Sequence, residues 1–173
     1  EDADKEAILK DVREALDDLK NFMDIGEATI EESQTEDKDW INNWKQYFHQ
    51  FYVDDILIIP SWEKVKTEDR DKMILHIDPG TAFGTGMHET TQLVIRQLKK
   101  YVTPDTEMLD VGTGSGILGI VALKLGAKHV LGTDLDPCAI PAVAENKEAN
   151  QIADESFDMV IGNIIDDKAI QDQ

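Results

Sequence analysis

The sequence predicts an α/β protein organised around a doubly wound, parallel β-sheet. From residue 107 onward, short apolar runs with strand character alternate with segments of helical periodicity, and such alternation indicates β-α-β units. A loop with a glycine at every second position, Gly112–Gly116, separates the first of these strands from its helix. Ligands bind at such loops in parallel α/β sheets, so the same region predicts the functional site.

The N-terminal part predicts one helix and one strand. Residues 5–23 carry apolar side chains at a helical period on one face, which predicts an amphipathic helix. Gly26 is a stop signal after it, and residues 28–33 alternate weakly, like an edge strand. One helix and one strand cannot close a hydrophobic core, so we expect this segment to need a partner.

The middle of the chain predicts an aromatic helix, two strands and a second helix. Residues 37–52 hold aromatic side chains at helical spacing, which favours a core-facing stripe over a base-stacking platform. Strands are predicted at 53–62, where Pro60 ends the strand, and at 73–78. Residues 90–101 predict a helix. The side chains that we expect this helix to direct inward are Leu93, Val94 and Leu98.

The C-terminal part supplies the parallel sheet. Strands are predicted at 107–111, 129–134 and 157–163, and helices at 117–126 and about 137–150. Because strands and helices alternate, each helix is expected to cross back over the sheet and to leave neighbouring strands parallel.

Composition narrows the class of protein. The net charge is −19, and residues 1–40 alone hold fifteen acidic and five basic residues. This balance disfavours broad nucleic-acid binding, which needs Lys and Arg; it suits a basic partner or an ordinary acidic surface. No apolar run approaches the roughly 18 residues of a membrane span, and the first residues do not resemble a signal peptide. A single cysteine, Cys138, fits a reducing compartment, so we expect a cytoplasmic protein.

The glycine loop and a following acid indicate a nucleoside-containing ligand. Gly112, Gly114 and Gly116 allow the backbone to approach a ligand, and the following helix aims its N-terminal dipole at it. Asp134 ends the next strand, 22 residues after Gly112, where a carboxylate can accept the ribose hydroxyls of an adenosine ligand. The loop also satisfies the dinucleotide fingerprint, so NAD remains an alternative.

Two polar residues favour a nucleoside with an amino-acid tail. Asp110 lies two residues before the first glycine, where it would attract a cationic amino-acid moiety. Asn163 ends a later strand and offers a neutral donor and acceptor at the carboxyl edge of the sheet.

The stretches LDVGTGSGILGIVALKLGA and TDLDP resemble class I S-adenosylmethionine-dependent methyltransferases. The segments EDKDWINNWKQYF, IIPSW, DPGTAFGTGMHETT and VIGNI are similar to the PrmA family of ribosomal protein methyltransferases, which modify protein eleven of the large subunit. The resemblance covers roughly residues 36–163, and DPGTAFGTGMHETT is its most specific part. It implies a Rossmann-like methyltransferase domain and a cytoplasmic enzyme that trimethylates amino groups on lysine side chains and the substrate's N-terminus.

The resemblance also implies a domain plan and a set of cofactor contacts. Residues 1–36 would be part of a ferredoxin-like substrate-recognition domain, 37–72 a linker helix and strand, and 73–173 the methyltransferase domain. The residues expected to contact S-adenosylmethionine are Phe83, Gly84, Thr91, Asp110, Gly112, Gly114, Gly116, Asp134 and Asn163. The expected partner is a basic protein of the large ribosomal subunit, with neither membrane nor direct nucleic-acid binding.

Methyl transfer from a sulfonium to an amine needs alignment more than acid–base catalysis. The amine must be uncharged, and burial beside a cationic sulfonium lowers its pKa, so no dedicated base is required. His88 is the best candidate base, although local bonding at a helix start is the favoured role. Asn163 could also orient the amine. No histidine spacing predicts a metal site.

The chain is shorter than the family pattern leads us to expect. Only residues 151–156 separate the predicted helix from the strand at Phe157, and a parallel crossover takes a dozen or more residues. We therefore expect that segments of the native chain are missing, with joins near 152/153 and 164/165. The remaining alternatives are a methyltransferase of RNA or a small molecule, an NAD-dependent oxidoreductase, and a non-catalytic binding module.

Overall fold

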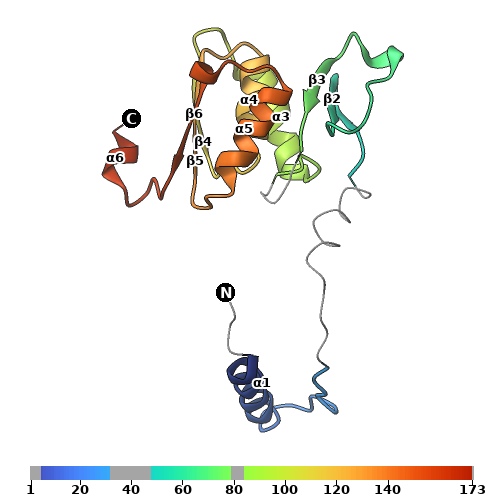
Figure 1. The fold of residues 1–173 in the computed structure, drawn as a ribbon, viewed down its shortest axis with the longest axis vertical. Coiled ribbons are helices and arrows are strands. Elements are labelled where there is room, and N and C mark those ends of the chain that lie inside the picture. Colours follow the sequence, from blue (N-terminus) through green and yellow to red (C-terminus); the bar gives the residue numbers. More distant parts are fainter. Residues whose placement is uncertain (1–4, 32–47, 79–83, 173) are drawn as a thin grey trace. The chain divides into compact units, whose positions relative to one another are not determined.

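The structure is a computed structural model that describes residues 5–31, 48–78 and 84–172. The chain divides into two compact units, residues 1–36 and residues 37–173 (Figure 1). The predicted aromatic helix lies mostly outside the described residues.

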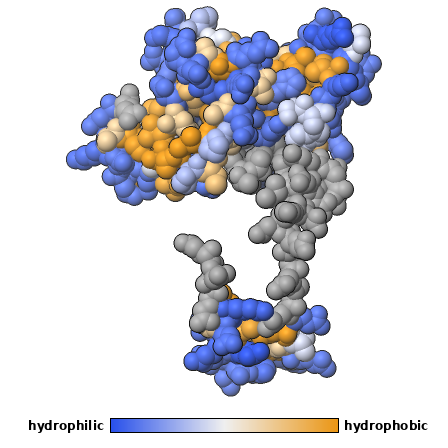
Figure 2. Space-filling view, in the orientation of Figure 1, coloured by the Kyte–Doolittle hydropathy of each residue, from blue (hydrophilic) through white to orange (hydrophobic). Residues whose placement is uncertain are grey.

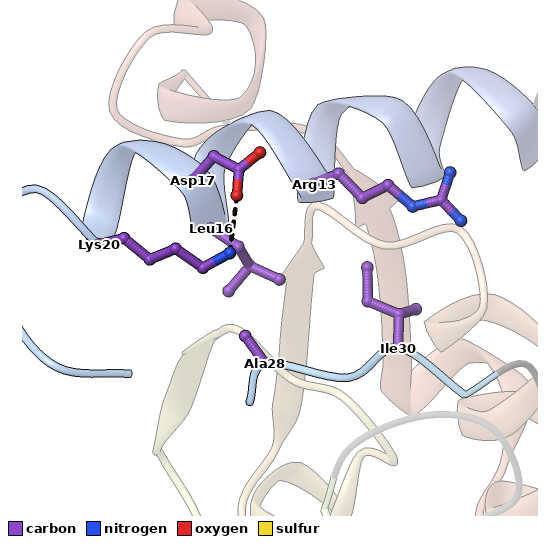
Figure 3. Close-up of a pocket in the computed structure, with 6 residues that line it drawn as sticks. All are labelled: Arg13, Leu16, Asp17, Lys20, Ala28 and Ile30. Carbon is purple, nitrogen blue, oxygen red and sulfur yellow. Dashed lines mark hydrogen bonds and ion pairs between the residues drawn. The ribbon is translucent and has the colours of Figure 1, made fainter. Parts of the chain in front are cut away.

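The first unit consists of helix α1 (Lys5–Leu19) and the segment that follows it. α1 has no buried side chain, although Leu16 is half-buried where it faces Ala28 and Ile30 across a cavity of about 290 Å³ (Figure 3). The edge strand predicted at 28–33 is absent from residues 28–31, where Ala28 takes a left-handed φ of 46°.

The second unit begins with a small mixed sheet. β1 (Phe51–Val53) and β2 (Ile56–Ile59) form an antiparallel hairpin, and β3 (Met73–His76) adds to β2 in parallel. The prediction of one continuous strand at 53–62 was therefore wrong, as was the extension of a helix to residue 52. The chain reverses at Asp54, whose φ of 55° is better tolerated by Asp than by most residues. The 3₁₀-helix η2 (Thr67–Asp69) lies in the β2–β3 connection.

The larger part of this unit alternates helices and strands as predicted. α3 (Glu89–Tyr101) precedes β4 (Glu107–Val111), α4 (Ile117–Lys124), β5 (His129–Asp134), α5 (Ala139–Ala149), η3 (Asp154–Ser156), β6 (Phe157–Ile161) and α6 (Lys168–Gln171). The strands are parallel in the order β4-β5-β6, with Asp110 opposite Gly132 and Asp134 opposite Ile161. The predicted α/β class with a parallel sheet is confirmed.

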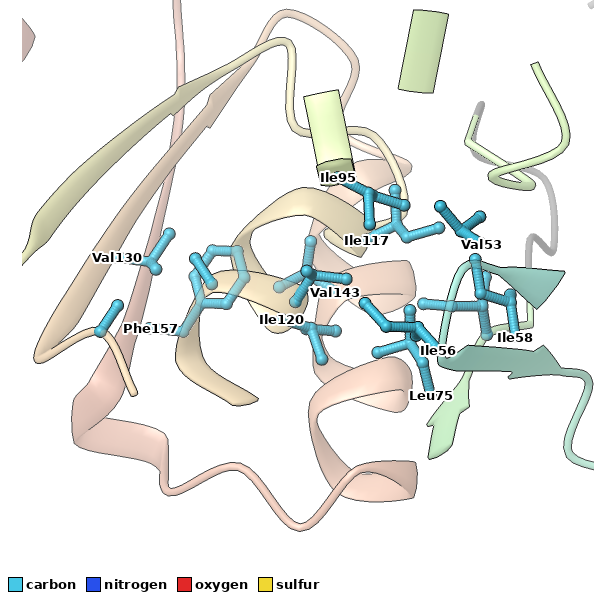
Figure 4. Close-up of a cluster of buried hydrophobic side chains, with 14 residues drawn as sticks. Val53, Ile56, Ile58, Leu75, Ile95, Ile117, Ile120, Val130, Val143 and Phe157 are labelled. Carbon is cyan, nitrogen blue, oxygen red and sulfur yellow. The ribbon is translucent and has the colours of Figure 1, made fainter. Parts of the chain in front are cut away.

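Helices α3, α4 and α5 lie between the two sheets (Figure 1), and the hydrophobic core fills this layer (Figure 4). Ile58 and Leu75 reach it from the small sheet, Ile120 from α4, and Phe157 from the parallel sheet. β1 and β2 thus contribute side chains to the same core as the parallel sheet. On α3 the inward residue is Ile95, fully buried, at a position that the sequence analysis missed.

The predictions for the other α3 side chains were partly wrong. Leu93 is 57% exposed and Val94 39% exposed, whereas Leu98 packs against the core. Ile95 and Leu98 are three residues apart and share one helical face. Leu93 lies on the opposite side of the helix, and Val94 lies at the border of the buried face.

A helix and a short segment connect β5 to β6 in this structure. α5 is itself the crossover between β5 and β6, which are parallel neighbours. The segment 151–156 only has to connect a helix end to a strand, and loops of about 2–6 residues commonly do so. The expected joins near 152/153 and 164/165 stay predictions.

The face of the parallel sheet turned away from the helices is only partly covered. Leu109 is 48% exposed and Val111 59% exposed, and α6 supplies Ile170 and Gln171 at one side of this face. Figure 2 shows hydrophobic surface over this part of the unit. Within the described residues, β4 has a hydrogen-bonded neighbour on one side only.

None of the helices in the described parts of the chain is long and apolar enough to span a membrane.

Candidate functional site

The glycine loop turns sharply between β4 and α4. Gly112, Gly114 and Gly116 have φ values of 75°, 52° and 80°, in the left-handed region that costs a residue with a Cβ about 1–2 kcal/mol. The Gly112 and Thr113 amides both donate to the Thr133 carbonyl, at 2.8 and 3.0 Å. The loop is therefore bonded to the end of β5.

A side chain at Gly112 would occupy space in a cleft at the carboxyl end of the sheet. Gly112 lines this cleft, and a Cβ built on this residue would have no other atom within 4 Å. Absence of a side chain here leaves space next to exposed backbone.

Asp134 connects the loop to the cleft. Its Oδ2 accepts the Gly114 amide at 2.8 Å, and its Oδ1 accepts the Asp136 amide at 3.0 Å. An ionised carboxylate has about four acceptor positions, so each oxygen can accept one further hydrogen bond. Asp134 is only half-buried and lines the cleft, which makes these positions available to a ligand.

The cleft occupies the edge where parallel α/β sheets bind ligands. Its volume is about 300 Å³. It is bounded by the last residues of β4 and β5 and by the segments that follow β4, β5 and β6. The lining residues are Val111, Gly112, Thr133, Asp134, Leu135, Gly162, Asn163, Ile164 and Ile165. Leu135 is 68% exposed and Ile165 79% exposed, so one wall of the cleft is apolar.

Asn163 lies on the β6 side of this cleft. Its Nδ2 donates to Asp166 Oδ2 at 2.7 Å, and its Oδ1 accepts the Ile165 amide at 3.0 Å. Because β5 lies between β4 and β6, Asp134 separates Asn163 from the glycine loop.

Asp110 lies behind the loop and does not line the cleft. It is 5% exposed and accepts the Thr113 hydroxyl at 2.8 Å. Burial raises the pKa of the Asp110 carboxyl, and the charge of Asp134 adds to the rise. In this position Asp110 supports the loop through Thr113.

The N-terminal end of α3 holds two further predicted residues. His88 is the N-cap of α3, and its Nδ1 accepts the Thr90 amide and lies 2.7 Å from the Thr90 hydroxyl. Thr91 is half-buried on the first turn. Neither lines the cleft.

Gly84 is bonded to the glycine loop, since its carbonyl accepts the Ser115 hydroxyl at 2.7 Å. Phe83 lies outside the described residues.

The structure thus gathers Gly112, Asp134 and Asn163 around one cleft. Leu135, Ile164 and Ile165 were not singled out from sequence, although their place directly after the predicted strand ends was a usable signal. Among the described residues, no three potential metal ligands gather at one place.

A family model described as ribosomal protein L11 methyltransferase (PrmA) matches residues 2–171. A ribosomal protein L11 methyltransferase from Lachnospira eligens is 59% identical over 169 residues, which cover 98% of this chain and 53% of that protein. One from Agathobacter rectalis is 51% identical over 172 residues, with the same two coverages.

A similar solved structure is the crystal structure of a ribosomal protein L11 methylase from Lactobacillus delbrueckii subsp. bulgaricus. It has a TM-score of 0.62 and 36% sequence identity, and the match covers 70% of this chain and 61% of that one. The chain spans about half the length of the curated relatives it matches.

Proposed function

The chain belongs to the ribosomal protein L11 methyltransferase (PrmA) family, and we propose that it transfers methyl groups from S-adenosylmethionine to amino groups of that ribosomal protein. The observation that carries this proposal is the cleft at Asp134, where a carboxylate with free acceptor positions lies beside the bare backbone of Gly112.

The residues of the cleft fit the parts of S-adenosylmethionine. Asp134 would accept the ribose hydroxyls, and the loop at Gly112 and Gly114 would hold the amino-acid end against its backbone. The apolar side chains of Leu135 and Ile165 would flank the adenine. The cofactor brings a methyl group on a positively charged sulfur, which leaves as a neutral thioether.

The proposed role of Asn163 changes with the strand order. Because Asp134 lies between Asn163 and the glycine loop, we assign Asn163 to the adenine side of the cofactor. A catalytic role for it, which sequence reasoning allowed, is not retained. His88 has the geometry of a helix cap, and we assign it no base function. Thr91 remains a proposed cofactor contact, and Asp110 is a support of the glycine loop.

The protein's task in the reaction is to hold a neutral amine in line with the methyl group. A lysine side chain has an ordinary pKa of about 10.4 and an α-amine about 7.7–8.0. Transfer of either amine to a site beside a cationic sulfur lowers its pKa, which favours the nucleophilic form without a dedicated base.

The substrate is proposed from the family and from charge. The relatives are named for ribosomal protein L11, and a chain with net charge −19 suits a basic protein better than RNA. We assign residues 1–36 to substrate recognition. A cytoplasmic location follows from this substrate and agrees with the free thiol of Cys138.

Calorimetric titration of the full-length protein with S-adenosylmethionine and with NADH tests the cofactor. We expect S-adenosylmethionine alone to bind. Asp134→Ala should weaken binding about 100-fold, since it removes two hydrogen bonds to a charged acceptor. Asp136→Ala, which changes a neighbouring acid outside the cleft, should have little effect.

A transfer assay with a labelled methyl donor then tests the substrate. Label on purified L11 at amino groups supports the proposal, whereas label on ribosomal RNA alone would identify a different methyltransferase. Tight NADH binding without S-adenosylmethionine binding would overturn the function as a whole.

A further inference from the structure

Two buried asparagines, one on α5 and one at its C-cap, bind the edge of β3 that β2 leaves unpaired. Asn146 is fully buried and Asn150 is 6% exposed. The Asn150 side chain accepts the His76 amide at 2.9 Å and donates to the His76 carbonyl. The Asn146 side chain accepts the Asp78 amide at 2.8 Å and donates to the Asp78 carbonyl at 3.3 Å. Each side-chain amide thus pairs with one backbone residue as a neighbouring strand would.

The spacing of the two asparagines matches that of the strand. Residues four apart on a helix are separated by about 6.0 Å along its axis, and alternate residues of a strand by about 6.6 Å. Asn146 and Asn150 therefore meet His76 and Asp78, which are alternate residues on the edge of β3 that β2 leaves unpaired. The two side chains hydrogen-bond to the backbone at His76, the last residue of β3, and at Asp78, two residues beyond it.

Asn146 differs from Asn150 in a contact with the glycine loop. Its Nδ2 also donates to the Ser115 carbonyl at 2.9 Å. Ser115 is fully buried, and its hydroxyl donates to the Gly84 carbonyl at 2.7 Å. Ser115 is thus linked to two residues that are far from the glycine loop in sequence: to Asp78 through the Asn146 side chain, and to Gly84 directly. A Cβ on Gly84 would lie 2.6 Å from the Ser115 hydroxyl oxygen, so the contact at Gly84 is close.

We propose that Asn146 is a positioning residue for methyl transfer, which acts through Ser115 to fix Asp78 and Gly84 relative to the cofactor loop. This inference rests on the proposed function. Asn146 itself is buried behind the loop and has no place in the cleft. Its effect on the reaction comes from the alignment of Asp78 and Gly84 with the glycine loop, and alignment is the main contribution that such a methyl transfer requires.

Asn150→Ala is a matched control for Asn146→Ala. Asn150 makes three hydrogen bonds, to the amide and carbonyl of His76 and to the Asn146 carbonyl. Asn146 also makes three, to the amide and carbonyl of Asp78 and to the Ser115 carbonyl. Each variant removes three side-chain hydrogen bonds, but only Asn146→Ala releases the glycine loop.

The variants are compared in the full-length protein by kinetics. We expect Asn146→Ala to raise the KM for S-adenosylmethionine roughly tenfold, in the range of one lost hydrogen bond to a buried group, and Asn150→Ala to change it less than twofold. Ser115→Ala removes only the bond to Gly84, and it should raise KM in the same direction without loss of folding. Equal kinetic effects of the two asparagine variants, or an unchanged KM in Ser115→Ala, would overturn the assignment.

Hydrogen exchange supplies a readout that does not depend on activity. Asn146→Ala should remove the protection of the Asp78 amide and retain that of His76, and Asn150→Ala should do the reverse. Loss of protection at both amides in both variants would show one cooperative structural unit and contradict separate roles. Wild-type protein that neither binds nor uses S-adenosylmethionine would instead refute the proposed function, so the two failures are distinguishable.

Discussion

The contact of Phe157 with Gly119 predicts a reversal in the effect of one substitution. Phe157 is 2% exposed, and a Cβ on Gly119 would lie 2.6 Å from its Cε1 and 2.9 Å from a methyl of Val130. Gly119→Ala gains about 0.8–1.0 kcal/mol of helix propensity, but overpacking costs about 1–3 kcal/mol. We expect a net loss of stability of about 0–2 kcal/mol.

Removal of the aromatic ring changes this balance. Phe157→Ala should itself cost about 3–5 kcal/mol, because it opens a cavity beside Gly119. In that background the added methyl enters empty space and Val130 can move aside, so Gly119→Ala should stabilise the protein by about 1 kcal/mol. Phe157→Leu provides a milder background, in which Gly119→Ala should destabilise the protein less than it does in the wild type.

The coupling is measured by urea unfolding, followed by circular dichroism, of the wild type, Gly119→Ala, Phe157→Ala and the double variant. Substitutions at distant, independent sites change the free energy of unfolding additively to within about 0.3–0.5 kcal/mol. If Gly119→Ala has the same effect in both backgrounds within that margin, the packing between α4 and β6 described above is incorrect.

Three further predictions concern the glycine loop, the β1–β2 turn and Asp110 of β4. Gly112→Ala should lower the free energy of unfolding by about 1–2 kcal/mol because of its left-handed φ, and an unchanged urea midpoint would argue against this conformation. Asp54→Asn removes the charge that pairs with Arg96 at 3.1 Å; we expect a loss below about 1 kcal/mol that disappears in 1 M salt, and a loss that persists in salt would exclude an ion-pair origin. Burial raises the pKa of Asp110, so the native state holds this proton more tightly, and stability should fall as pH rises from about 3.9 through the raised value. Unfolding measured at several pH values should show that Asp110→Asn lacks this part of the slope, and parallel curves for the two proteins would contradict it.

The parallel sheet could be predicted from the sequence because its signals are local. Each signal can be recognised within a few residues: the apolar runs at β4, β5 and β6, and the glycine loop. The β1–β2 hairpin was missed because Asp54 and Asp55 interrupt an otherwise apolar run without a glycine, and the turn depends on Asp54 taking a positive φ. The inward face of α3 was misjudged because several apolar residues compete, and only contacts with other elements select Ile95.

The site was predictable in part for the same reason. Asp134 follows a strand at a fixed distance from the glycine loop, so its place at the cleft could be expected. The place of Asn163 depends on which strand lies beside which, and chain order alone does not give it. Asn146 gave no signal, because its partners Asp78 and Ser115 are distant in sequence.

The unpaired side of β4 affects how this chain behaves in solution. Within the part of the chain that the structure describes, no strand pairs with this side, so its amides and carbonyls form a template on which another extended segment can add. The exposed Leu109 and Val111 give such a segment an apolar surface to cover. Handled by itself at high concentration, this chain is therefore expected to self-associate through strand addition. A lysine at position 109 would oppose that association by placing a charge on the growing edge.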